Sequence, residues 1–335
     1  MNSHLLPFPY NQSKPPSWLE RVTQPLSSVL LGEPKRPTQQ ELPRTPIPLQ
    51  NHGDSLSPIR IICISDTHNK TPPLPPGDIL VHAGDLTVHG TFDEVQAQLR
   101  WLSSQPHSHK IVIAGNHDIL LDEASDTKFL TRGGDSAAER QKLDWGGVQY
   151  LQNEAITLEL PIPGRTSQQA RKVKIYGSPL TPELGSWAFQ YPPIRDVWTG
   201  QVPNDTDILI VHGPPALYGD CDGEKGTTGI VKVKGDGYLL REIRRVRPKV
   251  VICGHTHGAY GLAVIQHDGI QDVMDGLQMR WKGYGFLEAL GRTLRSKVTT
   301  RRNIDSRKET LVINAAVAPS SLESKDKRAI AIDFH

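Results

Sequence analysis

The stretch IVIAGNHDIL, residues 111–120, begins with an apolar, β-favouring half and then changes character. Gly115 is followed by three polar side chains, Asn116, His117 and Asp118, before the sequence turns apolar again. A short apolar run of this kind is typical of a strand buried on both faces of a sheet. Because histidine titrates near neutral pH, a buried strand that stops at Asn-His-Asp indicates a chemical site at its end.

Six more apolar runs of strand length share this pattern. They are IRIICIS, DILVHAG, VKIYGS, DILIVHG, KVVICG and LVINAA, which start at residues 59, 78, 173, 207, 249 and 311. Two connections, TFDEVQAQLRWLSSQ and DGYLLREIRRVRP, place apolar residues on one helical face and predict amphipathic helices from about residues 92 and 237. The arginines of the second helix are interpreted as a solvated face rather than a phosphate clamp.

Five of the apolar runs stop at side chains able to bind a metal ion. These residues are Asp66, His68, Asp85, Asn116, His212, His255 and His257. Alone, each is more often a turn former, a cap or a packed residue. Because ligands gather outside the carboxyl ends of strands in such sheets, we expect all seven at one sheet edge. Mixed oxygen and nitrogen donors without thiolate suit two divalent ions such as Mn, Fe or Zn, and not calcium.

Counting charges at this site favours an anionic substrate. Two divalent ions bring four positive charges, of which Asp66, Asp85 and a bridging hydroxide would remove three. The remaining positive charge favours a phosphodiester or a phosphomonoester. Asp85 is the best candidate to bridge the ions, because a carboxylate has two oxygens to share. Paired ions can generate hydroxide at neutral pH and stabilise both ends of an in-line displacement.

Composition narrows the class of protein. The 335 residues carry a net charge of +2, which gives no reason to expect a nucleic-acid polymer or a membrane surface as partner. Cys63, Cys221 and Cys253 are odd in number and widely spaced, so no disulfide framework or cysteine-based zinc site follows. We see no signal peptide and no apolar run near the ~20 residues of a transmembrane helix. We therefore expect a soluble protein of a reducing, cytoplasmic compartment.

The sequence divides into an arm and a domain. Residues 1–58 are rich in Pro, Ser and Gln and predict a flexible N-terminal arm, because proline disrupts helices and central strands. A linker is favoured over a docking motif there. Residues 59–335 predict one domain with an insertion at about 269–308. The insertion is compatible with one or two amphipathic helices, packed against the domain rather than on a membrane surface.

The order Asp-x-His, Gly-Asp, Gly-Asn-His-Asp, His and Gly-His-x-His resembles the calcineurin-like metallophosphoesterases over residues 59 to about 333, apart from the insertion. This resemblance implies an α/β fold, a four-layer α/β/β/α sandwich of two mixed sheets flanked by helices, with a dinuclear metal centre. The stretches VHAGDLT, YGSPLTPELGSWAFQY and ILIVHGPP are similar to the metallophosphoesterase-domain subgroup (239AB-like and UPF0046-like). The arm and the insertion resemble fungal-type members.

The resemblance also implies a role for each site residue. One ion would bind Asp66, His68, Asp85 and His257, and the other Asp85, Asn116, His212 and His255. His117 would be the histidine that binds no metal, placed to protonate the leaving alkoxide or to steady the phosphoryl oxygens. Asp118 would hold the ring of His117 in the productive tautomer, with capping of the following segment as an alternative or additional role.

Contacts to substrate are less defined by the sequence. Gly213 is a candidate because a glycine would let the backbone approach a ligand. His82 is interpreted as a packed residue or a support for a ligand rather than a ligand itself. Trp187, Phe189 and Tyr191 belong to the SWAFQY block, which lies near the site in the subgroup, although core packing is at least as strongly favoured.

The predicted function is hydrolysis of a small phosphodiester, with a 3′,5′-cyclic nucleotide as first candidate. A metal-bridging hydroxide would attack phosphorus in line, which makes the protein a phosphoric ester hydrolase, with manganese one of the candidate ions. A phosphomonoesterase or a Ser/Thr protein phosphatase is the enzymatic alternative, since the same ligands serve all three. A metal-binding regulatory protein with low turnover is the alternative of a different class.

Overall fold

The computed structural model describes residues 45–49, 57–128, 136–162, 170–220, 235–268, 271, 272, 275, 308–319 and 327–335. The chain divides into two compact units, residues 1–36 with 268–305, and residues 37–267 with 306–335. The fold described below is that of the second unit.

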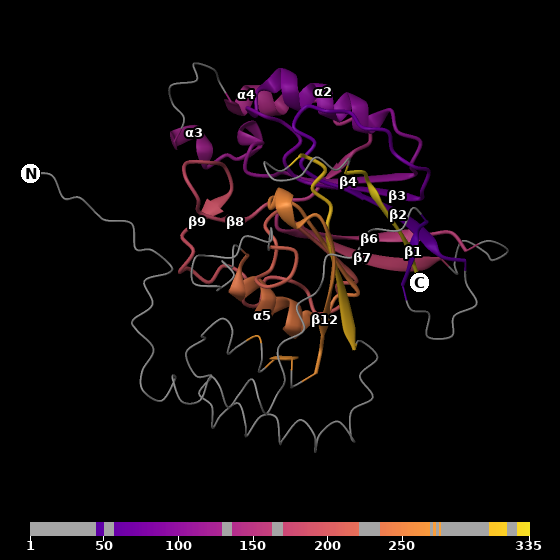
Figure 1. The fold of residues 1–335 in the computed structure, drawn as a ribbon. Helices are drawn as coiled ribbons and strands as arrows, with labels where there is room; N and C mark the ends of the chain where they lie inside the picture. Colours follow the sequence, from indigo (N-terminus) through magenta and orange to yellow (C-terminus); the bar gives the residue numbers. More distant parts are fainter. Residues whose placement is uncertain are drawn as a thin grey trace, which may run out of the picture. The chain divides into compact units, whose positions relative to one another are not determined.

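This unit contains two mixed sheets of six strands each, together with a small two-stranded sheet (Figure 1). The first sheet has the order β1 (Ile47–Pro48), β14 (Ile330–Phe334), β2 (Ile59–Ile64), β3 (Ile79–Ala83), β4 (His109–Ile113) and β5 (Gln149–Tyr150). The second has the order β12 (Gly261–Gln266), β13 (Glu309–Asn314), β11 (Val250–Cys253), β10 (Ile208–Val211), β7 (Arg171–Ser178) and β6 (Glu154–Leu160). The small sheet pairs β8 (Thr181–Pro182) with β9 (Gln190–Tyr191).

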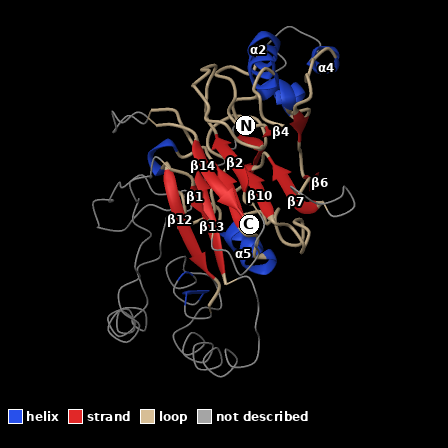
Figure 2. Cartoon of the chain, turned by 90° about the vertical axis from the view of Figure 1, so that its right-hand side faces the viewer, coloured by secondary structure: helices blue, strands red, loops and turns tan. Residues whose placement is uncertain are grey.

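Both large sheets have a parallel centre and antiparallel neighbours. Strands β2 to β5 run parallel, and so do β7, β10, β11 and β13. Strand β14 is antiparallel to β2, and β6 and β12 form the antiparallel edges of the second sheet. Figure 2 shows β1, β14 and β2 side by side, and β12 beside β13. The carboxyl ends of the parallel strands of each sheet therefore lie at one edge.

The apolar runs fill two layers of core, because successive side chains of a strand point to opposite faces. In β2, Ile61 and Cys63 belong to the cluster between the sheets, together with Ile210 and Ile252 of the second sheet. The outward residues of the first sheet pack instead against Val95, Leu99 and Leu102 of helix α2 (Phe92–Ser103). Two-sided burial explains why these strands are continuously apolar.

Two helices cover the sheets on the outside. In Figure 1, α2 lies above the first sheet and α5 (Gly237–Val246) below the second. A capping box between Thr91 and Glu94 starts α2, and the Asp236 side chain caps α5. The layers follow the order α/β/β/α, which confirms the predicted sandwich. The shorter helices are α3 (Ser125–Lys128), α4 (Ser136–Gln141), and the 3₁₀ turns η1 (Ile119–Leu121) and η4 (His257–Ala259).

All seven predicted strands and both predicted helices are present. Strands β6, β12 and β14, whose residues are only alternately buried, were not predicted, and neither were the two-residue strands β1, β5, β8 and β9. Within the predicted arm, Ile47 and Pro48 pair with β14, while most of residues 1–56 lies outside the described residues. The predicted insertion at 269–308 also lies outside them, apart from residues 271, 272, 275 and 308. Within the described part of the chain, no helix has the length and apolarity needed to cross a membrane.

Candidate metal centre

The seven predicted ligands follow the carboxyl ends of five strands and lie together. In the first sheet, β2 leads to Asp66 and His68, β3 leads to Asp85, and β4 leads to Asn116. In the second sheet, β10 leads to His212, and β11 leads to His255 and His257. In three overlapping groups, the potential ligand atoms lie within 4.8 Å of one another: Asp66, His68 and His257; His68, Asp85 and His117; and Asp85, His212 and His255. We call the seven predicted ligands the metal-ligand cluster.

The first group of the metal-ligand cluster joins the two sheets. The Nε2 atom of His257 lies 3.1 Å from Oδ1 of Asp66 and 3.4 Å from Nε2 of His68. His68 donates from Nδ1 to the carbonyl oxygen of Thr87 at 3.0 Å, so its Nε2 atom faces the group as a lone-pair donor. Asp66 is fully buried and accepts hydrogen bonds from the backbone N–H of His255.

The third group is arranged around His212. Its Nδ1 atom donates to the carbonyl oxygen of Ala83 at 2.8 Å, which turns Nε2 toward the centre. That Nε2 atom lies 3.3 Å from Oδ1 of Asp85 and 3.2 Å from Oδ1 of Asn116. The other oxygen of Asp85, Oδ2, lies 3.8 Å from Nε2 of His68. The two oxygens of Asp85 therefore face the two groups, as expected of a carboxylate shared by two ions.

Electrostatics show that the cluster attracts positive charge. Burial disfavours a charged Asp66, yet its hydrogen bond to His257 and the charge of His212 hold its pKa below the usual range. Burial likewise opposes a charge on His212, but Asp85 and Asp66 raise its pKa to about 9. Burial lowers the pKa of His255 to about 4, which leaves a neutral imidazole suited to metal binding. Two buried carboxylates facing imidazole nitrogens are a donor set that fits divalent cations.

The loops that carry the cluster are conformationally strained. Four of the ligands have positive φ angles: 55° for Asp66, 44° for His68, 53° for Asp85 and 64° for His255. These angles lie in the left-handed region, which residues other than glycine rarely adopt. Each such residue costs on the order of 1–3 kcal/mol, and such strain concentrates at functional sites. A Cβ atom on Gly254 would overlap the carboxylate of Asp66, so the glycine of the last motif makes room for that ligand.

A model of the calcineurin-like phosphoesterase family matches residues 59–259. The chain belongs to this family. Metallophosphoesterase domain-containing protein 1 of Homo sapiens is 34% identical over 212 residues, which cover 61% of this chain and 62% of that protein. A UPF0046 protein of Caenorhabditis elegans is 33% identical over 211 residues, covering 61% of this chain and 70% of its own. These relatives place the chain in the predicted metallophosphoesterase-domain subgroup.

A further relative has a different name. "Probable rhamnogalacturonate lyase C" of Emericella nidulans is 37% identical over 280 residues, which are 82% of this chain and 24% of that protein. The chain thus spans about a quarter of that relative and 62% of the human one. Family membership together with the metal-ligand cluster supports a divalent metal centre in this calcineurin-like phosphoesterase.

His117 lies beside the cluster, and its ring is held by a different residue from the one predicted. Its Nδ1 atom donates to the carbonyl oxygen of Val88 at 2.8 Å, and its ring meets that of His68 edge-on with centroids 4.8 Å apart. The prediction that Asp118 orients this ring is wrong, because its carboxylate bonds elsewhere. Val88 holds the tautomer instead, and a backbone carbonyl leaves no signal in the sequence.

Asp118 connects two loops of the first sheet. One of its oxygens accepts from the backbone N–H of Leu86 and of Gly115, and the other from the backbone N–H and the hydroxyl of Thr87. Burial and the charge of Asp85 raise the pKa of Asp118 to about 6. Asp118 precedes η1 but makes no capping hydrogen bond with its side chain, so the alternative prediction of a cap is also wrong.

The remaining predicted residues lie around the cluster rather than in it. His82 is fully buried and its Nε2 atom lies 3.0 Å from the hydroxyl of Thr67, which confirms a packed histidine behind the ligands. A Cβ atom on Gly213 would meet Thr181 and Pro182, neither of which belongs to the cluster. The role of Gly213 in substrate binding therefore stays a prediction.

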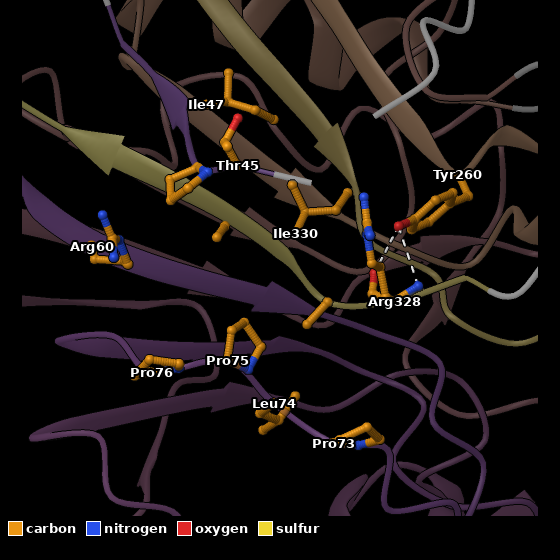
Figure 3. Close-up of a pocket in the computed structure, with 13 residues that line it drawn as sticks. Thr45, Ile47, Arg60, Pro73, Leu74, Pro75, Pro76, Tyr260, Arg328 and Ile330 are labelled. Carbon is orange, nitrogen blue, oxygen red and sulfur yellow. Dashed lines mark hydrogen bonds between the residues drawn. The ribbon is translucent and has the colours of Figure 1, made fainter. Parts of the chain in front are cut away.

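A separate cavity lies elsewhere in the same unit (Figure 3). It has a volume of about 530 Å³ and is lined by residues that include Arg60, Leu74, Tyr260, Arg328 and Ile330. The hydroxyl of Tyr260 donates to the carbonyl oxygen of Arg328 at 2.7 Å at its wall. No residue of the metal-ligand cluster lines this cavity.

Proposed function

We propose that this chain is a metal-dependent phosphoesterase that hydrolyses a small phosphodiester, with a 3′,5′-cyclic nucleotide as first candidate. The observation that carries the proposal is the position of Asp85, whose two oxygens face His212 at 3.3 Å and His68 at 3.8 Å. A carboxylate between two groups of imidazoles is the arrangement that a pair of divalent ions needs. Membership of the calcineurin-like phosphoesterase family supports the same reaction class.

The proposed ligand sets divide at Asp85. One ion, Mn, Fe or Zn, would be held by Asp66, His68, Asp85 and His257, and the second would be held by Asp85, Asn116, His212 and His255. When bound, such ions polarise phosphoryl oxygens and make water more acidic at neutral pH. The protein's own contribution is orientation, since His68 and His212 each hold their other ring nitrogen on a backbone carbonyl.

His117 supplies the proton in this proposal. Its Nδ1–H donates to the carbonyl oxygen of Val88, so Nε2 is the nitrogen that can give a proton, which it carries when the ring is an imidazolium with both nitrogens protonated. Water, which loses one proton to solvent, supplies the oxygen of the new P–O bond, and the old P–O bond breaks with its electron pair on the leaving oxygen. That oxygen takes the proton from Nε2 of His117. General acids of this kind contribute about 10²–10⁴-fold.

The test combines metal analysis of the purified chain with rates on cyclic nucleotides, aryl diesters and aryl monoesters in the presence of Mn. We expect hydrolysis of diesters by the wild type and strong losses in Asp85→Asn and His117→Ala. Asp78→Asn and His109→Ala are matched controls, because both residues lie at the opposite ends of strands β3 and β4. If the wild type hydrolyses no substrate faster than buffer alone does, the proposal is overturned. If it prefers monoesters, the diester assignment is wrong and the protein is a phosphomonoesterase.

A further inference from the structure

The indole of Trp187 covers one face of the His117 ring. The two ring centroids lie 4.2 Å apart and the planes are inclined by 32°, which is a tilted contact rather than an edge-on one. Trp187 is only partly buried, and the three residues before it are exposed, with Leu184 at 74%. Trp187 also packs against the outer core cluster of the first sheet, but core packing alone does not require its contact with the proposed acid.

The backbone around Trp187 is fastened to the loop that carries His117. The N–H of Ala188 donates to the carbonyl oxygen of Asn116 at 3.1 Å, and the N–H of Phe189 donates to Asp122 at 2.9 Å. The segment that carries Trp187 is thus hydrogen-bonded to the chain before and after His117. The N–H of Trp187 itself donates to the side chain of Gln190 at 3.1 Å. These bonds fix the backbone from which the indole extends.

One hydrogen bond cannot fix an imidazole ring by itself. The bond from Nδ1 to Val88 sets the tautomer of His117 but leaves the ring free to tilt about it. The ring of His68, in an edge-to-face contact at 4.8 Å, and the indole of Trp187, at 4.2 Å, both limit this tilting. We propose, on the basis of the function proposed above, that Trp187 is a positioning residue that keeps Nε2 of His117 aimed at the leaving oxygen of the phosphoester.

The consequence depends on the leaving group. When the P–O bond breaks, an alkoxide needs the proton from Nε2, whereas p-nitrophenolate is stable without it. A misplacement of about 1 Å can cost on the order of 10²-fold in rate. Trp187 should therefore matter for alkyl leaving groups and hardly at all for p-nitrophenyl ones. A residue that merely stabilised the fold would affect both alike.

The experiment compares Trp187→Leu and Trp187→Phe on phosphodiesters that differ only in a p-nitrophenyl, phenyl or alkyl leaving group. We expect Trp187→Leu to slow the alkyl ester about 10–100-fold and the p-nitrophenyl ester less than about 3-fold. Trp187→Phe keeps an aromatic face and should recover most of the alkyl rate. Trp145→Leu is the matched control, because Trp145 also stacks on a ring, that of Tyr150, at 5.1 Å.

A double-mutant cycle and a spectroscopic readout complete the test. If Trp187 acts through His117, His117→Ala/Trp187→Leu is no slower on the alkyl ester than His117→Ala alone. Metal content should be unchanged in Trp187→Leu. In NMR spectra, the ring protons of His117 should lose the ring-current shift of the indole in Trp187→Leu and keep an aromatic shift in Trp187→Phe.

The outcomes separate this proposal from the proposed function. Equal losses on all three esters, or additive losses in the double variant, overturn the positioning role of Trp187. If His117→Ala leaves the alkyl rate unchanged, His117 is not the acid, and the positioning role of Trp187 falls with that acid role, whereas the hydrolytic function itself falls only if the wild type is inactive. If His117→Ala is slow and Trp187→Leu is as fast as wild type, only the role of Trp187 falls.

Discussion

The two sheets contribute different chemistry to the same cluster. Among the described residues, both carboxylates, Asp66 and Asp85, come from the first sheet, whereas the second sheet supplies three imidazoles. Each carboxylate faces a histidine of the other sheet, Asp66 with His257 at 3.1 Å and Asp85 with His212 at 3.3 Å. Negative charge collected in one half is thus balanced from the other half, and neither sheet alone forms the site.

Hydrogen bonds across the sheets reinforce this division. The N–H of His255 donates to Asp66, and the ring of His212 donates to the carbonyl oxygen of Ala83, which ends β3. Strain is unequal as well, since the first sheet holds three of the four ligands with positive φ angles. The first sheet therefore provides both carboxylates and most of the strain, and the second provides three imidazoles, two of which face those carboxylates.

The largest expected effect comes from Asp85→Asn, which removes the carboxylate shared by both ligand groups. Loss of one ion removes several kcal/mol of charge stabilisation, so kcat/KM should fall on the order of 10³-fold at ~1.4 kcal/mol per tenfold. Metal analysis should show fewer bound ions. Asp78→Asn, an exposed residue before the same strand, is the control and should behave as wild type. Undiminished metal content in Asp85→Asn would contradict the shared role.

His257→Ala tests the contribution of the second sheet. Residues that support a metal ligand contribute about 10–100-fold, so loss of a proposed ligand is expected at the upper end, about 10²-fold in metal affinity. Asp66 keeps its hydrogen bonds from His255, so the fold should persist. His267→Ala, at the far end of the second sheet, is the control. A metal titration in which both variants match the wild type rules out the ligand role of His257.

Asp118→Asn addresses stability in the first sheet. The carboxylate accepts four hydrogen bonds, and an amide would turn an NH₂ donor toward some of the same donors. Hydrogen bonds to a charged group are each worth about 1.5–3 kcal/mol, so we expect a loss of about 2 kcal/mol in the free energy of unfolding. Denaturant unfolding measures this loss.

The matched change on the side of the second sheet is Glu242→Gln. Glu242 is also a buried carboxylate, on α5, and accepts from the N–H groups of Gly200 and Val202. It should lower stability comparably but leave metal affinity unchanged, whereas Asp118→Asn should lower both. Equal effects of the two variants on metal affinity would contradict the idea that Asp118 supports the metal-ligand cluster by holding the loops of the first sheet.

Whether a strand could be predicted from the sequence depended on whether it is buried on both faces or on one. Strands buried on both faces, such as β2 and β10, are continuously apolar and stand out in the sequence. Strand β6 is an edge strand with one exposed face, so EAITLEL contains few apolar residues in succession. Strands β12 and β14 alternate in the same way. Burial alternates along these segments, and a criterion of continuous apolar runs does not detect that alternation.

The site divides along a similar line. The ligands could be predicted because parallel strands bring their carboxyl ends together, whatever the details of packing. The orientation of His117 could not, because its partner is the carbonyl oxygen of Val88, which any residue would supply. The partners of Asp118 are mostly backbone N–H groups for the same reason. Trp187 lies seventy residues from His117 in sequence, and only the tertiary fold places it on that ring.

The smallest expected effect concerns the helix that covers the first sheet. Thr91→Ala removes the hydroxyl that accepts from the N–H of Glu94 at the start of α2. Losing such a cap costs about 1 kcal/mol, or ~2–4 °C in Tm for a domain of this size. Thr91→Ser keeps the hydroxyl and should melt as wild type does. Because α2 packs on the outer face of the first sheet, Thr91→Ala should not change metal content, and a loss of bound metal would show that the cluster depends on this outer layer as well as on the two sheets.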